Sequence, residues 1–180
     1  QFVGAEMIAK KHGHTKEQLD AFSVESHKRG AEATKAGAFK DEIVALKGRD
    51  PEGNEVMHDK DEGIRYDASM EGMAKLKILM DDGIMTAANA SQICDGSSGV
   101  NLTPLARIHN LTVTAGDPVI MLEEPLFATD RALQRAGMKM SDIDLYEVNE
   151  AFAPVPIAWL KHHGADPAKL NVNGGAIALG

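Results

Sequence analysis

The sequence is poor in cysteine and in aromatic residues: its 180 residues include one Cys, and Phe, Trp and Tyr together make up 4%. A single cysteine excludes a disulfide within the chain and favours, though only weakly, a reducing compartment. With so few aromatic rings, a core must be packed mainly by aliphatic side chains and the nine methionines. We therefore expect a protein of the cytoplasm or of an organelle interior (mitochondrial or peroxisomal in a eukaryote), not a disulfide-stabilised fold.

Positive charge and long apolar runs are also scarce. The formal net charge is −8, which argues against nonspecific nucleic-acid binding because that requires clustered Lys and Arg. It does not exclude an anionic small-molecule ligand, since a few local basic side chains suffice for that. No apolar run reaches membrane-spanning length. We expect neither a nucleic-acid partner nor a membrane span.

What is present is ordinary for a globular protein: 43% hydrophobic and 26% charged residues, at a length that fits one domain or parts of two. In the first half, Thr15 and Gln18 have the spacing of a capping box, and Gly13 and Gly37 are placed to end helices. The pattern predicts helices over residues 5–12, 16–36 and 70–80, strands over 43–46 and 56–58, and extended chain over 84–88.

The second half alternates strand-like and helix-like segments. Residues 105–113 and 143–148 alternate in the manner of strands, and Val172 begins a third. Pro125 suits the start of a helix that ends at Gly137. This order predicts a mixed sheet with crossover helices.

The most informative segment is Asn149-Glu150-Ala151-Phe152, between a predicted strand and an apolar helix-like stretch that reaches Leu160. An Asn in this position is commonly a helix N-cap, but its amide can also stabilise a developing oxyanion. In that helix, Pro156 is expected to remove a backbone hydrogen bond or to kink it. Further on, Gly174-Gly175 follows a short predicted strand, where glycine allows the backbone to approach a ligand closely.

These two segments, Glu147–Ala153 and Asn171–Gly180, closely resemble the C-terminal half of thiolases, the acetyl-CoA acyltransferases. Earlier segments extend the resemblance: Gly4–His12, Gln18–Phe22, Phe39–Val44, Asp61–Arg65 and Thr86–Ser91, in order. The resemblance implies a partial α/β thiolase-like fold, with a layered mixed sheet, helices and a helical loop domain. It assigns residues 1–85 to the loop domain, 86–100 to the truncated end of the N-terminal domain and 101–180 to the first part of the C-terminal domain.

The resemblance also shows what the chain lacks. In thiolases the nucleophilic Cys lies upstream of these segments, the catalytic His follows the final Leu-Gly, and a second Cys lies further on. The chain is therefore expected to be an internal piece that is inactive alone. Between Gly96 and Pro104 it is shorter than the layered fold needs.

By the same resemblance, the whole protein is a thiolase that cleaves 3-ketoacyl-CoA or condenses acyl-CoA units, without a prosthetic group, as a homodimer or homotetramer. Coenzyme A and acyl-CoA are its substrates and partners. Asn149 is the expected catalytic residue, holding a water in an oxyanion hole. The expected coenzyme A contacts are Arg65, Met80, Ala87, Ser91, Ala151 and Phe152.

Several residues allow other interpretations. Cys94 is expected to be a small buried residue, and the seven histidines show no metal-ligand spacing; His162 and His163 are expected to lie at a helix C-terminus. Glu150 is either structural or functional. Ketoacyl synthases share the fold but carry a different motif at the Asn149 position. A non-catalytic thiolase-like protein that binds lipid or coenzyme A is the alternative function.

Overall fold

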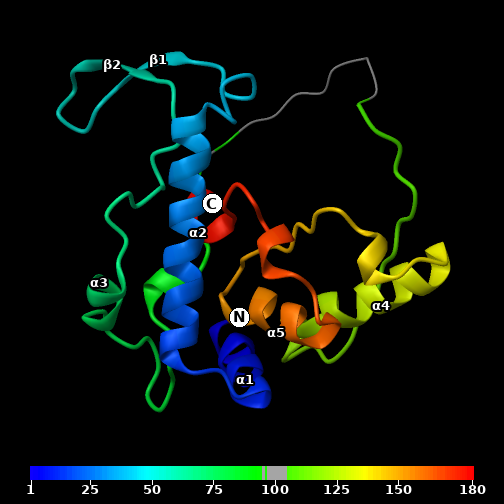
Figure 1. Cartoon of the computed structure of the whole chain (residues 1–180). Helices are drawn as coiled ribbons and strands as arrows, with labels where there is room; N and C mark the ends of the chain where they lie inside the picture. The colour runs from blue at the N-terminus through cyan, green and yellow to red at the C-terminus, as the bar shows by residue number, and fades with distance from the viewer. Residues whose placement is uncertain (95, 97–104) are drawn as a thin grey trace.

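The longest helix, α2 (Lys16–Ala36), passes through the middle of the computed structural model, which describes residues 1–94, 96 and 105–180 (Figure 1). The predicted capping box starts it: Thr15 Oγ1 accepts a hydrogen bond from Gln18 N, and Gln18 Oε1 accepts one from Thr15 N. Gly37 ends it with φ 76°, in the left-handed region. Helix α1 (Phe2–His12) ends in the same way at Gly13. Both predicted helix ends are confirmed.

The remaining helices are shorter. They are α3 (Met70–Ala74), α4 (Glu124–Ala136), α5 (Pro154–His163) and α6 (Ala176–Leu179), with 3-10 turns at Ala87–Asn89, Met121–Glu123, Met140–Asp142 and Pro167–Lys169. Pro125 lies in the first turn of α4 and Gly137 ends it, as predicted. No helix in the described part of the chain is both long and apolar enough to cross a membrane.

Two apolar clusters hold these elements together. One lies where α1 and α4 meet α5 and includes Ile8, Leu126, Val155, Trp159 and Leu170. The other joins α1 and α2 to the chain around residue 152 and includes Ala5, Leu19, Met85, Phe152 and Ile177. Because residues from both ends of the sequence fill both clusters, the N- and C-terminal segments form one packed unit.

The strands differ from the prediction. Strand β1 (Leu46–Arg49) pairs antiparallel with β2 (Glu55–His58), with Leu46 opposite His58, and this hairpin lies near the C-terminal end of α2 (Figure 1). The predicted strand at 56–58 is confirmed, whereas that at 43–46 was placed about three residues early. The β1–β2 hairpin is the one sheet formed by the described residues.

The strands expected in the second half do not form. Residues 105–117 have no regular structure, and Leu105 and Val113 are 96% and 89% exposed. The segments 143–148 and after Val172 are reduced to isolated bridges, among them a parallel one between Tyr146 and Leu170. A strand is stable only with a hydrogen-bonded neighbour, so an alternating pattern alone was insufficient. The shortened region 97–104 lies outside the described residues.

Two helix boundaries were also wrong. Helix α3 ends at Ala74, not near residue 80, because the chain turns and Ile78 bridges back to Thr86. Helix α5 begins at Pro154, five residues after Asn149. Pro156 is therefore the third residue of the helix, where the N–H has no intrahelical partner, and it removes no helix hydrogen bond.

Candidate functional site

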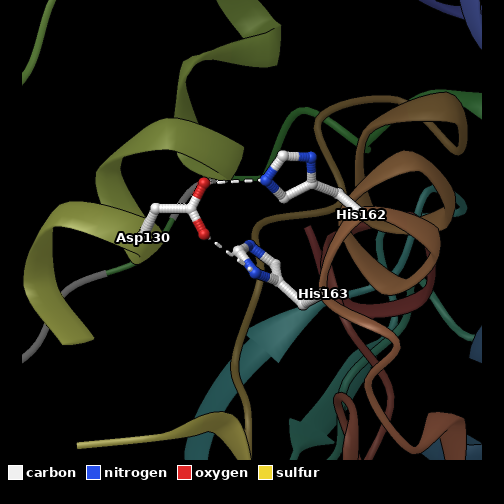
Figure 2. A group of neighbouring side chains, drawn as sticks. All are labelled: Asp130, His162 and His163. Carbon is white, nitrogen blue, oxygen red and sulfur yellow. Dashed lines mark hydrogen bonds and ion pairs between the residues drawn. The ribbon is translucent and has the colours of Figure 1, made fainter. Parts of the chain in front are cut away.

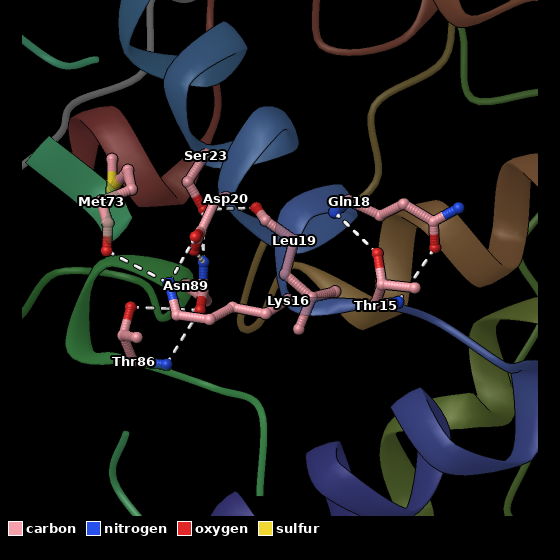
Figure 3. A network of polar contacts seen from close by, with 9 residues as sticks. All are labelled: Thr15, Lys16, Gln18, Leu19, Asp20, Ser23, Met73, Thr86 and Asn89. Atoms are coloured by element: carbon pink, nitrogen blue, oxygen red, sulfur yellow. Dashed lines mark hydrogen bonds and ion pairs between the residues drawn. The ribbon is translucent and has the colours of Figure 1, made fainter. Parts of the chain in front are cut away.

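A fully buried asparagine, Asn89, joins the chain after residue 85 to helix α2 (Figure 3). Its Oδ1 accepts hydrogen bonds from Thr86 N at 2.8 Å and from the Thr86 hydroxyl at 3.1 Å. Its Nδ2 donates to Asp20 Oδ1 at 3.2 Å and to Ser23 Oγ at 3.1 Å, both on α2. Lys16 Nζ in turn donates to the Asp20 carboxylate. The Asn89 amide thus accepts two hydrogen bonds and donates two, which is its full capacity, and the network fixes this turn against helix α2.

The segment after this turn runs alongside the Asn149-Glu150-Ala151-Phe152 motif. Ser91 N donates to Ala151 O at 3.0 Å, Ala153 N donates to Asn89 O at 2.8 Å, and Ala90 and Phe152 form an antiparallel bridge. These bonds place the backbone of the motif directly beside the segment that carries the predicted coenzyme A contacts.

The side chain of Asn171 pairs with the backbone of Val148, just before the motif, as a neighbouring strand would. Its Oδ1 accepts from Val148 N and its Nδ2 donates to Val148 O, both at 2.9 Å, and the same Nδ2 donates to Glu150 Oε1 at 2.9 Å. Asn171 is 1% exposed and has φ 45°, a left-handed conformation that asparagine tolerates better than most residues. This residue therefore sets the path of the chain into the motif.

The Gly-Gly turn is packed against protein, not open to a ligand as expected. A Cβ on Gly174 would lie 2.9 Å from Gly30 N, on α2, and Gly174 has φ 92°. A Cβ on Gly175 would overlap the side-chain carboxylate of Glu150. Both glycines are required because backbone and a buried carboxylate come too close for any side chain.

A pocket of about 450 Å³ opens between α2, α3 and the Asn89 turn, within the size range of small-molecule sites. Its walls are mainly small or apolar side chains, including Ala68, Leu76, Ala87, Ala88, Ala90 and Ile177, and its polar groups include His27, Arg65, Asp67 and Gln92. Two of the predicted coenzyme A contacts, Arg65 and Ala87, line this pocket.

His27 is a pocket residue to which the sequence assigned no role. Its side chain is buried, and its Nδ1 accepts a hydrogen bond from Arg65 N at 3.1 Å. Burial, together with the neighbouring Arg65 charge, lowers the pKa of His27, so the ring is a neutral acceptor near pH 7. Gln92, also unassigned, donates from Nε2 to Gly63 O and Ile177 O, both at 2.8 Å. No sequence pattern signals these contacts, because each joins segments distant in the chain.

The other predicted contacts lie around the pocket. Ser91 is exposed at its edge, next to Ala151, whereas Met80 is half-buried outside the lining. Phe152 is 5% exposed and packs edge-to-face on Phe2, with ring centroids 5.1 Å apart. Its side chain belongs to the core in this structure.

Asn149 lies apart from this pocket, in a wider apolar groove of about 1030 Å³. The groove runs between residues 109–114, helix α4 and residues 143–149, and Asn149 is exposed within it. Asn149 precedes the first turn of α5 by several residues, so it is not the N-cap of that helix. Asn149 therefore lines a different cavity from Arg65 and Ala87, although the motif that carries it runs beside the segment of predicted coenzyme A contacts.

One further expectation, on Cys94, was wrong, and the paired histidines make a contact that the sequence did not signal. Cys94 is exposed, not buried. His162 and His163 do lie in the last turn of α5, as predicted, but they also meet Asp130 of α4. Their spacing gave no metal signal because the third group is 32 positions away in the sequence.

Both halves of the chain match models of thiolase domains: residues 2–105 match the thiolase N-terminal domain and residues 102–180 the thiolase C-terminal domain. Human mitochondrial 3-ketoacyl-CoA thiolase superposes with a TM-score of 0.88 at 38% identity, over 99% of this chain and 48% of that one. These matches define a partial α/β protein with the thiolase fold, as predicted. The chain belongs to the thiolase family.

Among curated proteins, the steroid 3-ketoacyl-CoA thiolase FadA6 of Mycobacterium tuberculosis is 46% identical, over 100% of this chain and 46% of its own length. An acetyl-CoA acetyltransferase of Chromobacterium violaceum is 44% identical, over 99% and 48%. A 3-ketoacyl-CoA thiolase of Marinomonas is 43% identical, over 99% and 50%. The chain spans about half the length of the curated relatives it matches.

Proposed function

We propose that this chain is part of a thiolase, a coenzyme A-dependent acyltransferase that cleaves a 3-ketoacyl-CoA with a second coenzyme A, or condenses acyl-CoA units in reverse. Membership of the family and the names of relatives at 43–46% identity support this reaction class. Cleavage yields acetyl-CoA and an acyl-CoA shortened by two carbons, and requires no prosthetic group.

One observation carries the proposal: the Asn149–Phe152 motif lies hydrogen-bonded alongside the segment that walls the Arg65 pocket. Coenzyme A has an anionic nucleotide end and a long, mostly apolar arm. In the pocket, Arg65 can bind the anionic nucleotide end, and the apolar side chains around Ala87 can contact the arm. Ser91 and Ala151 lie at the edge of the pocket. Met80 and Phe152 are assigned to coenzyme A binding by family resemblance.

Asn149 is proposed to stabilise the oxyanion that forms on the thioester oxygen. Negative charge develops on a thioester oxygen both when the acyl group is taken up and when the new bond is made, so two oxyanion holes are required. A water held by the Asn149 amide is proposed to line one of them. The exposure of Asn149, and the absence of a helix cap at that position, leave its side chain available for this role. The acyl-accepting nucleophile is proposed to come from outside these 180 residues.

The test is thiolysis of acetoacetyl-CoA by the full-length protein, with Asn149→Ala as the variant. Loss of one oxyanion-hole donor is expected to lower kcat about a hundredfold with little change in KM. Asp144→Ala, at an exposed position of the same segment, is the matched control and keeps full activity. An Asn149→Ala protein with unchanged kcat overturns the proposed role.

The alternative function is a non-catalytic thiolase-like protein that binds coenzyme A or lipid. A full-length protein that binds acyl-CoA but turns over neither acetoacetyl-CoA nor longer 3-ketoacyl-CoA would establish it. We also propose the domain assignment 1–85, 86–100 and 101–180, a homodimeric or homotetrameric assembly, and a location in the cytoplasm or an organelle interior. The family resemblance supports each of these.

A further inference from the structure

Three potential metal ligands meet between helices α4 and α5 (Figure 2). Asp130 lies midway along α4, and His162 and His163 occupy the last turn of α5. Asp130 Oδ2 is 2.8 Å from His162 Nε2, and Asp130 Oδ1 is 3.5 Å from His163 Nδ1. One ligand atom from each residue lies within 4.8 Å of the other two.

Aromatic packing and one hydrogen bond hold this cluster in place. Trp159 Nε1 donates to Thr129 Oγ1 at 2.9 Å, which joins the two helices one residue before Asp130. The Trp159 ring lies 4.8 Å from the His163 ring, centroid to centroid. The arrangement is therefore built into the packing of α4 on α5.

Burial differs between the three groups in a way that suits an ion-binding site. The His163 side chain is 4% exposed, whereas those of His162 and Asp130 are 32% and 53% exposed. One ligand is thus fixed by the core, and two lie at the surface where an ion can reach them. A site with one buried and two accessible ligands needs little rearrangement on binding.

The buried histidine has unused hydrogen-bonding capacity. Its Nε2 is buried and has no hydrogen-bond partner among the described residues. Its Nδ1 contact with Asp130, at 3.5 Å, is longer than the 2.7–2.9 Å typical of a charge-assisted hydrogen bond. The nitrogen that faces Asp130 is Nδ1, and without a close hydrogen bond to the carboxylate it is in a position to coordinate an ion.

The same 3.5 Å separation matches two ligands that share one ion. With zinc–nitrogen and zinc–oxygen bonds of about 2.0–2.2 Å in a tetrahedron, neighbouring ligand atoms lie about 3.3–3.6 Å apart. Imidazole and carboxylate together favour Zn²⁺ and similar first-row cations, while Mg²⁺ and Ca²⁺ prefer ligand sets made of oxygen.

We propose that Asp130, His162 and His163 form a binding site for a divalent first-row transition-metal ion, with Zn²⁺ as its representative. The ion replaces the direct Asp130–His162 hydrogen bond and bridges α4 to α5, and water completes its coordination. Thr129 and Trp159 also line the groove that contains Asn149, so the bound ion stabilises one wall of that groove. The competing explanation is a cluster of ion pairs that binds no metal.

The experiment is a calorimetric titration of Zn²⁺ into the full-length protein, expressed without a histidine tag and stripped of metal. Two variants, Asp130→Asn and His162→Gln, each remove one exposed ligand and leave the buried His163 untouched. Each is expected to weaken binding at this site by at least about tenfold. Zn²⁺ should raise the melting temperature of the parent protein, and each variant should lose that increase.

His58→Gln is the matched control, because His58 and Glu62 form an exposed histidine–carboxylate pair, 2.9 Å apart, that lacks a third ligand in the described chain. This variant should bind Zn²⁺ as the parent does. Co²⁺ should give visible d–d absorption in the parent and the control but not in the two site variants, and excess Mg²⁺ should not displace Zn²⁺. Equal Zn²⁺ affinity in the parent, Asp130→Asn and His162→Gln overturns the proposal and leaves only an ion-paired cluster.

Discussion

The Ser26 hydroxyl donates a hydrogen bond to the carboxylate of Glu150, with Oγ 2.6 Å from Oε2, across 124 positions of sequence. Glu150 is 1% exposed and also accepts from Asn171 Nδ2 at 2.9 Å and from Ile177 N at 3.1 Å. Ser26 Oγ in turn accepts from Gly175 N. One carboxylate thus connects helix α2, the Asn149 motif and the final turn, so Glu150 has a structural role.

Glu150→Ala should lower the free energy of unfolding by about 3–5 kcal/mol, because it leaves three buried donors without an acceptor. Glu150→Gln should lower it by about 1–3 kcal/mol, since the new amide NH₂ faces donors. Urea unfolding measures both. The matched control is Glu147→Gln: burial, followed by the Glu150 charge, raises the pKa of Glu147, so its neutralisation should not destabilise the protein. Equal stability of the Glu150 variants and the parent would contradict the structural role.

Asn171→Ala should destabilise the protein by about 3 kcal/mol. It removes the paired hydrogen bonds with Val148 and the bond to Glu150, and places alanine in a left-handed conformation. Asp82 provides the comparison, because it is exposed and has a similar φ of 58°. Asp82→Ala should show only the conformational cost of about 1 kcal/mol. If chemical denaturation gives both variants the same loss, the hydrogen bonds of Asn171 contribute nothing net.

Stability should decrease in mild acid because of His14. Burial, followed by the charges of His12 and Lys161, lowers its pKa from 6.5 to about 4. Between these two values the unfolded chain binds a proton that the folded chain does not, so the free energy of unfolding falls as pH drops from 6.5 towards 4 and is fully retained above 6.5. The shift corresponds to about 3 kcal/mol, which partial exposure of the ring reduces to about 1–2 kcal/mol.

Urea unfolding at several pH values checks this, with His14→Gln expected to flatten the slope between pH 6.5 and 4. Identical slopes for the parent and His14→Gln would rule out His14 as the source of acid sensitivity.

Arg65→Ala in the full-length protein should raise KM for coenzyme A several-fold and leave kcat nearly unchanged, because the contact serves ground and transition states alike. A chain of net charge −8 has no general positive field to attract an anionic nucleotide, so a local donor is needed. An exposed contact of this kind is worth about 1 kcal/mol and should weaken with salt. Arg135→Ala, exposed on α4, is the control. An unaltered KM at low ionic strength would show that Arg65 is an ordinary solvated side chain.

Local signals in the sequence predicted helices α1, α2 and α4 well. The capping box at Thr15, the glycines after α1, α2 and α4, and the proline that begins α4 are read from neighbouring residues alone, and each is confirmed. Family resemblance supplied the fold class, which no local pattern could. The strands were predicted poorly, because a strand depends on a partner that sequence periodicity does not identify.

The candidate site was only partly predictable for the same reason. Arg65 and Ala87 could be assigned from a motif, but His27 and Gln92 enter the pocket through backbone contacts with distant segments. The Asp130–His162–His163 cluster depends on the packing angle of two helices, which leaves no regular spacing in the sequence. Residues that act through long-range contacts were therefore found in the structure.

The Ser26–Glu150 bond also has a consequence for how the chain folds. Closing a loop of 124 positions carries a length-dependent entropic cost of about 4 kcal/mol. Only the contacts made after Ser26 and Glu150 meet can offset this cost. Helices α1 and α2 are specified by their own caps and can form early, whereas the last thirty or so residues must wait for this closure. We therefore expect the long-range junction between Ser26 and Glu150 to form after helices α1 and α2.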